Sequence, residues 1–177
     1  MSASVKHLAF IALTISVSAS ADALKVDWPA DWQREDVPAP DSPFEANVQG
    51  ERERAFRLQP NGEQAVVAEL TRLPLPTQQE VTLDRVLREM RQGVQLGFAQ
   101  SGLQTACKPP TDTHLGNLPA REVSCTATQG GRPVLQQSLL MARSDTAVYS
   151  MTFAMPADQA ETVADEIRQV RDGLKLP

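Results

Sequence analysis

Two cysteines and two histidines are the side chains in this sequence best suited to nucleophilic, redox or metal chemistry. Cys107 and Cys125 are separated by 18 positions, whereas a thioredoxin-like redox pair has two residues between its cysteines. His114 is the only histidine beyond residue 23, and no residue beside it has the pattern of an activated nucleophile. Two cysteines and one histidine are also too few for a typical zinc site. We therefore predict no catalytic, cofactor-binding or metal-ligating residue and no bound cofactor.

Paired carboxylates are the remaining route to catalysis, as in glycoside hydrolysis. Glu35 and Asp36 are adjacent, but they lie in a proline-rich segment that offers no rigid element to hold them. Glu161, Asp165 and Glu166 fall on the polar side of a predicted helix, without the aromatic residues that line a sugar-binding cleft. A hydrolase is therefore the least favoured function class.

The composition argues against nucleic-acid binding. The 177 residues include 17 Lys and Arg against 22 Asp and Glu, a net charge of −5, so there is no basic excess to displace counterions from phosphates. Five Phe, two Trp and one Tyr are also few for stacking on bases. Hydrophobic residues make up 41% of the chain, which is enough for an ordinary globular core.

Residues 1–23 have the three regions of a secretory signal peptide. Lys6 supplies a positive charge, Leu8 to Val17 form an apolar run, and small residues follow. The apolar run is about half the roughly 20 residues that a membrane-spanning helix needs. We predict a signal peptide over residues 1–23, a single domain over 24–177, a periplasmic location, and no membrane span after cleavage. Cleavage after Ala21 and cleavage after Ala23 both fit the small-x-small pattern.

Export favours a disulfide between Cys107 and Cys125, because exported proteins fold in an oxidising compartment. A loop of this length would stabilise the fold by roughly 3 kcal/mol in the chain-entropy model. The bond requires Cα atoms within roughly 4.4–6.8 Å of each other. Two free buried thiols are the alternative.

Strand patterns recur along the chain. Residues 51–58 and 63–72 flank the turn signal Pro60-Asn61-Gly62, which favours a hairpin. Residues 121–128, 133–142 and 147–155 alternate in polarity around a Gly-Gly turn at 130–131, which predicts a three-stranded meander. The alternating charges at residues 51–54 are typical of a solvated face, and a ligand-binding role for Arg52 or Arg54 has no further support. Trp28 and Trp32 favour an anchor for the N-terminal segment over an exposed partner-binding strip.

Two amphipathic helices complete the pattern. One begins near Leu83, where Thr82 can cap the start and Asp84 suits the positive end of the helix dipole. The other begins near Ala160, where Asp158 can cap the start and Glu161 is in capping-box position. Their apolar stripes predict packing on a sheet: Leu83, Val86, Leu87, Met90 and Val94 in the first, and Ala160, Val163, Ala164, Ile167, Val170 and Leu174 in the second. The predicted fold class is α+β, an antiparallel sheet of five to seven strands with two main helices on one or both faces.

The residues that suggest a family follow one another along the chain: Trp32, Gly62 with residues 63–68, the helix from Leu83, residues 116–121, Gly130-Gly131, residues 149–153, and Leu174-Lys175-Leu176. Their order resembles the PsbP-like α/β sandwich proteins, including the DcrB-type periplasmic members. The resemblance covers roughly Asp27 to Pro177. The chain also resembles small exported proteins of Gram-negative bacteria. DcrB-type members are typically lipid-anchored, whereas this chain has no cysteine near residue 23, and the cysteine pair is not a general feature of the family.

The resemblance implies a non-enzymatic binding or accessory protein whose partner is another periplasmic or envelope protein. The alternative is a small-ligand carrier with an apolar cavity between helix and sheet, lined by residues such as Met90, Phe98, Met151 and Phe153. The same four side chains are also suited to an ordinary core, so the shape of the interior decides between these interpretations.

Overall fold

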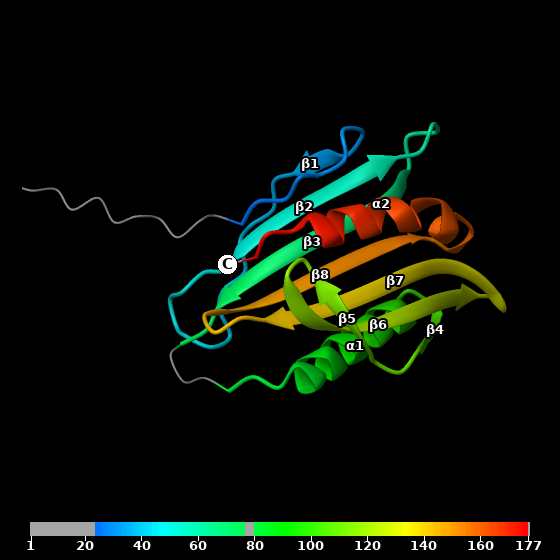
Figure 1. Ribbon diagram of the computed structural model, residues 1–177. Helices are drawn as coiled ribbons and strands as arrows, with labels where there is room; N and C mark the ends of the chain where they lie inside the picture. The colour runs from blue at the N-terminus through cyan, green and yellow to red at the C-terminus, as the bar shows by residue number, and fades with distance from the viewer. Residues whose placement is uncertain (1–23, 77–79, 177) are drawn as a thin grey trace, which may run out of the picture.

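The computed structural model describes residues 24–76 and 80–176 and shows an antiparallel sheet with two helices (Figure 1). The predicted signal peptide, residues 1–23, lies outside the described residues. The helices are α1 (Leu83–Gln100) and α2 (Ala160–Gly173), and a 3₁₀ turn, η1 (Ala157–Gln159), precedes α2. The strands are β1 (Gln33–Glu35), β2 (Glu51–Leu58), β3 (Gln64–Pro74), β4 (Gln104–Cys107), β5 (Thr111–Leu115), β6 (Leu118–Gln129), β7 (Arg132–Arg143) and β8 (Ala147–Pro156).

The described strands form one sheet in the order β1-β2-β3-β8-β7-β6-β4, and β5 also pairs with β6. The predicted hairpin is β2–β3, in which Gly62 adopts a φ of 84° and its amide donates to the Gln59 carbonyl. The predicted meander is β6–β7–β8, with Gly130 and Gly131 both at positive φ between β6 and β7. Both local predictions are confirmed, because turn residues and alternating polarity act over short stretches of chain.

The prediction of five to seven strands is wrong, since the sheet has eight. One extra strand arises because Pro109 and Pro110 interrupt the edge strand that pairs with β6. A proline has no amide hydrogen to donate to the ladder, so this edge divides into β4 and β5. β1 has only three residues and lies in the proline-rich N-terminal segment, outside the predicted hairpin and meander.

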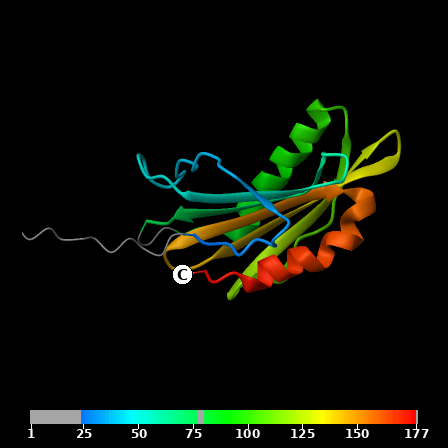
Figure 2. The ribbon, with the colours of Figure 1, turned by 90° about the horizontal axis from the view of Figure 1, so that it is seen from above.

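The two helices cover opposite faces of the sheet (Figure 2). α1 packs on β4, β6 and β7, where Leu87 is buried in a cluster with Val123, Leu139 and Met141. α2 packs on the other face, where it buries Val163, Ile167 and Val170. The predicted stripes therefore face the sheet, with the exception of Ala164, which is exposed.

Neither predicted side-chain cap forms a hydrogen bond, although Thr82 is at the predicted N-cap position. Thr82 occupies the N-cap position of α1, but its hydroxyl makes no cap hydrogen bond. Asp158 lies inside η1, and the N-cap of α2 is Gln159. The 3₁₀ turn shifts the start of α2 beyond the capping-box spacing, so the backbone of the preceding turn leads into the helix instead.

Trp28 and Trp32 anchor the N-terminal segment, as predicted. Their rings stack with centroids 5.7 Å apart, and Trp32 is only 6% exposed. The indole Nε1 of Trp32 donates to Glu166 of α2 at 3.2 Å. The segment before β1 is thereby fixed to the α2 face, where it completes the core.

Candidate functional site

The face of the sheet under α1 is only partly covered. α1 packs on β4, β6 and β7, and the side chains of β3 and β8 on the same face border a groove of about 490 Å³. We call this the α1 groove. One wall is α1, through Val86 and Met90, and the opposite wall is the segment that carries Pro40, Pro43 and Phe44. Each wall is mainly apolar and contributes one carboxylate, Glu89 on α1 and Asp41 on the opposite segment. The groove thus lies between two segments far apart in sequence.

The wall opposite α1 is a folded loop. The Asp41 and Gln49 backbones form a bridge, and the Gly50 amide donates to the Pro40 carbonyl at 2.7 Å. Gly50 lies so close to β3 that an added Cβ would meet the Arg72 carbonyl oxygen and the Leu73 side chain. Only a residue without a side chain fits this approach, so Gly50 sets the position of the wall.

The floor of the α1 groove combines hydroxyl groups with apolar side chains. Thr71 from β3 and Ser150 and Thr152 from β8 line it, together with Met141 and Val148. These residues alternate with the core residues of the opposite face, such as Leu70 and Met151, because successive strand residues point to opposite sides. The floor can thus both donate and accept hydrogen bonds.

The charged groups of the groove floor are paired with one another. Arg52 lies 3.5 Å from Glu69, and Arg54 lies 3.0 Å from Glu35 and 3.9 Å from Glu69. Arg52 and Glu69 line the α1 groove, whereas Arg54 lines the hollow beside it. The carboxylates of Asp41 and Glu89 also line the groove, at its two walls. A second hollow of about 260 Å³ continues past Glu69 and Thr152 toward Arg54. The sequence pattern placed these charges on a solvated face, and the pattern alone did not reveal that they line a groove.

A third hollow of about 320 Å³ lies between α1 and the β5–β6 edge. Arg88, Arg91 and Arg121 line it. The Arg121 guanidinium binds Asp112 at 2.6 Å and Asp84 at 3.0 Å, and the hydrogen bond to Asp112, reinforced by the charge of Asp84, raises the pKa of Arg121. Within the part of the chain that the structure describes, Arg88 and Arg91 have no ion-pair partner.

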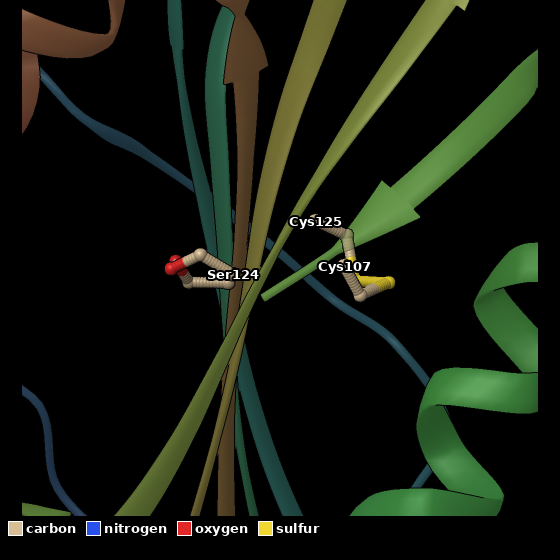
Figure 3. Close-up of a disulfide and its surroundings, with 4 residues drawn as sticks. Cys107, Ser124 and Cys125 are labelled. Atoms are coloured by element: carbon tan, nitrogen blue, oxygen red, sulfur yellow. A yellow bond between two sulfur atoms is a disulfide. The ribbon is translucent and has the colours of Figure 1, made fainter. Parts of the chain in front are cut away.

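The opposite face has a smaller crevice of about 170 Å³ between α2 and strands β6 and β7. Ser124 and Ser138 lie at its floor, with their hydroxyl oxygens 3.1 Å apart. Figure 3 shows Ser124 pointing away from the neighbouring cysteine, to the other side of the sheet.

The disulfide between Cys107 and Cys125 is present (Figure 3). The two residues are direct partners in the β4–β6 ladder, and their Cα atoms are 4.0 Å apart. That distance lies below the expected range, since residues that face each other across a narrow pair in an antiparallel ladder approach more closely than typical bridged cysteines. The bond joins the edge strand to β6 beneath α1.

The residues considered for chemistry do not converge. His114 is exposed on β5, and Glu166 serves as an acceptor for Trp32 and lies 3.5 Å from Arg57. Glu35 is paired with Arg54. Within residues 24–76 and 80–176, no group of three or more His, Cys, Asp or Glu side chains is arranged to hold a metal ion.

The predicted lining of a ligand cavity is wrong in its composition. Met90 lines the α1 groove, but Met151 is fully buried on the opposite face and Phe153 borders the crevice beside α2. The four residues therefore do not share one cavity. In β8, the even-numbered residues Val148, Ser150 and Thr152 line the α1 groove. Met151 and Phe153 alternate with them and therefore point to the face away from α1.

No helix in the described ranges is both long and apolar enough to cross a membrane.

Comparisons with known proteins give a family and a fold. A family model described as domain of unknown function (DUF4946) matches residues 23–176. No curated protein matches the sequence significantly. The solution structure of cyanobacterial PsbP (CyanoP) from Synechocystis sp. PCC 6803 is similar, with 11% identity, a TM-score of 0.61, and coverage of 85% of this chain and 84% of that one.

Two further structures share less of the architecture. LpqN of Mycobacterium tuberculosis, described as involved in cell envelope biogenesis, has 17% identity, a TM-score of 0.44, and coverage of 84% of this chain and 80% of its own. PA94 of Pseudomonas aeruginosa has 14% identity, a TM-score of 0.41, and coverage of 84% and 88%. The cyanobacterial structure shows that the fold is PsbP-like, whereas the DcrB-type periplasmic assignment stays a prediction.

Proposed function

The chain belongs to the domain of unknown function family DUF4946, and we propose that it is an exported, non-enzymatic accessory protein that binds an extended, mostly apolar segment of another envelope protein. The α1 groove is the observation that carries this proposal. Apolar walls from α1 and from residues 40–44 enclose a floor of hydroxyl groups, an arrangement that suits apolar side chains attached to a hydrogen-bonding backbone.

Export is supported by two independent features. Residues 1–23 have the pattern of a signal peptide. Cys107 and Cys125 form a disulfide, and disulfides persist mainly in oxidising compartments such as the bacterial periplasm. The single domain over residues 24–177 is then the folded part of the exported protein in this proposal.

The Arg52–Glu69 ion pair favours an uncharged segment over the groove floor, and the carboxylates of Asp41 and Glu89 at the walls disfavour an acidic one. Arg52 and Arg54 already contact Glu69 and Glu35, so an incoming charge would have to displace an existing partner. Binding would then depend mainly on apolar contact and backbone hydrogen bonds. We expect the affinity for the partner to change little with ionic strength, because ionic strength weakens mainly contacts between exposed charges.

The resemblance to PsbP-like sandwich proteins supports an accessory role, since relatives of that type act as assembly or accessory factors. Fold alone does not fix function. The proposal therefore depends on whether the α1 groove, rather than another surface, makes the contact.

A matched pair of variants tests this point. Thr152→Arg places a long charged side chain on the floor of the α1 groove. Thr126→Arg makes the same change on the opposite face, where Thr126 pairs with Gln136 of the α2 crevice. The tagged full chain would be expressed in a Gram-negative host and recovered from the envelope fraction with any bound protein. We expect Thr152→Arg to lose the partner and Thr126→Arg to retain it. Retention by both variants, or equal loss from both, would overturn the proposal.

A small-ligand carrier is the second candidate. The α1 groove, at about 490 Å³, falls within the roughly 300–1,000 Å³ of known small-molecule sites. Native mass spectrometry of the protein recovered from the envelope distinguishes the two. A stoichiometric small apolar molecule that is absent from Thr152→Arg would favour the carrier, whereas a chain mass without adduct, together with a protein partner, would favour the accessory role.

A further inference from the structure

The backbone at Leu24 is held by a carboxylate. The Leu24 nitrogen donates a hydrogen bond to Oε2 of Glu51 on β2. The other oxygen of the same carboxylate, Oε1, accepts from Arg72 Nη1 of β3 at 2.7 Å. Each carboxylate oxygen of Glu51 therefore accepts one hydrogen bond, and the Leu24 nitrogen is one of the two donors.

The chain from Leu24 onward is part of the core. Leu24 is 8% exposed and Val26 only 1%, and both lie in the cluster that contains Leu70 and Leu176. Arg34 of β1 also donates to the Val26 carbonyl at 3.2 Å. The position of the Leu24 nitrogen is thus fixed by side-chain burial as well as by its hydrogen bond.

We propose that the peptide bond between Ala23 and Leu24 is the processing site of the exported chain, and that the α-ammonium group released there forms an ion pair with Glu51. This inference rests on the exported location in the proposed function. The reaction is a hydrolysis by a signal-peptidase-type endopeptidase. The oxygen of water bonds to the carbonyl carbon of Ala23, which becomes a carboxylate, and the Leu24 nitrogen leaves as an amine and takes up a proton.

Cleavage at this bond converts a neutral donor into a charged one at a site that already contains its counter-ion. The precursor's amide already donates to an ionised acceptor, Glu51. An α-ammonium donor adds to this bond the Coulomb attraction between two opposite full charges. The precursor presents only an amide hydrogen to Glu51. Removal of the leader therefore strengthens the attachment of the N-terminal segment to β2 in the folded protein.

The sequence leaves two cleavage positions open, and in this proposal the contact between Leu24 and Glu51 distinguishes them. Cleavage after Ala21 would leave Asp22 and Ala23 ahead of Leu24, so the Leu24 nitrogen would remain a neutral amide. The free amine would then be up to about 7 Å of chain away from the Leu24 nitrogen. The carboxylate of Asp22 would also be added ahead of Leu24, which is the residue that contacts Glu51. Only cleavage after Ala23 places the new charge at the Glu51 carboxylate.

The first test determines the mature N-terminus. The full chain would be expressed in a Gram-negative host, recovered from the envelope, and analysed by mass spectrometry of its N-terminal peptide. The inference predicts Leu24 as the first residue. A chain that begins at Asp22 would overturn this inference but leave the exported function intact, whereas a chain that retains Met1 would overturn both.

The second test measures the ion pair directly. Two mature forms would be released from a cleavable fusion, one beginning at Leu24 and one at Asp22, each with and without Glu51→Gln. Glu53→Gln, on the same strand and face, is the control for loss of a carboxylate at another position. Glu51→Gln weakens the contact with Arg72 in both mature forms, so the stability lost with that contact cancels when the two forms are compared.

We expect Glu51→Gln to lower the Tm by about 2–4 °C more in the form that begins at Leu24 than in the form that begins at Asp22. Glu53→Gln should affect the two forms equally. Selective acetylation of the α-amino group of the Leu24 form should reproduce the additional loss without any substitution. Equal losses for Glu51→Gln in the two forms, or no effect of acetylation, would show that no such ion pair forms.

Discussion

Leu87 is the residue through which the packing of α1 can be measured most clearly. Of the residues of α1, it alone is classed as buried, with 0% exposure, and it lies in the cluster with Val123, Leu139 and Met141. Leu87→Ala removes buried apolar volume and leaves a cavity that the sheet beneath cannot easily fill. Substitutions of this kind cost about 2–5 kcal/mol. Because α1 also forms a wall of the α1 groove, the same change should loosen the candidate binding site.

The assay is equilibrium unfolding in urea, with thermal unfolding as a second measurement. At about 2–4 °C per kcal/mol for a protein of this size, a cost of about 2–5 kcal/mol means that Leu87→Ala should lower the Tm by roughly 4–20 °C. Leu96→Ala is the matched control, because Leu96 lies on the same helix and is 61% exposed. Its effect should stay within about 0.5 kcal/mol. A loss below about 1 kcal/mol for Leu87→Ala, or equal losses for the two variants, would refute the packing of α1 on this face.

Three further predictions concern other fixed points of the fold. Replacing Cys107 and Cys125 together by alanine should cost about 2–4 kcal/mol in urea unfolding, and a reducing agent should destabilise the parent protein but not this variant. Gly116→Ala should lower the Tm, because Gly116 has a φ of 56° and a Cβ there would collide with the Leu174 carbonyl oxygen; an unchanged Tm would contradict this contact. Gly50→Ala should displace the wall opposite α1 and reduce the amount of partner recovered with the protein. Full retention of the partner would show that this wall does not contribute to binding.

The parts of the fold that depend on local sequence could be predicted. Alternating polarity with Gly130-Gly131 at the turn identifies β6 and β7, and the spacing of Leu83, Leu87 and Met90 identifies α1. Such patterns depend on which side chains face the core, and that information lies within each segment.

The parts that depend on contacts between distant segments could not be predicted. β1 has three residues, too few for a periodic signal, and it forms only because it pairs with β2. The caps at Thr82 and Asp158 were inferred from residue type, whereas the observed helix starts depend on the preceding turns.

The candidate site itself belongs to this second group. The α1 groove exists because α1 packs toward β4, β6 and β7 and leaves part of the same face uncovered. The sequence predicts an amphipathic helix, but it does not specify where on the sheet that helix lies. For the same reason, Met90 and Met151 could be proposed as neighbours although they lie on opposite faces.

Site-specific photo-crosslinking tests the proposed role of the α1 groove most directly. A photoreactive amino acid would replace Val86, which lines the groove, or Leu96, an exposed residue elsewhere on the same helix. Irradiation of cells that export each variant should covalently join the position 86 variant to one envelope protein through an extended, mostly uncharged peptide, and position 96 should give no such product. Equal crosslinking from both positions, or crosslinks from position 96 alone, would contradict binding in the groove.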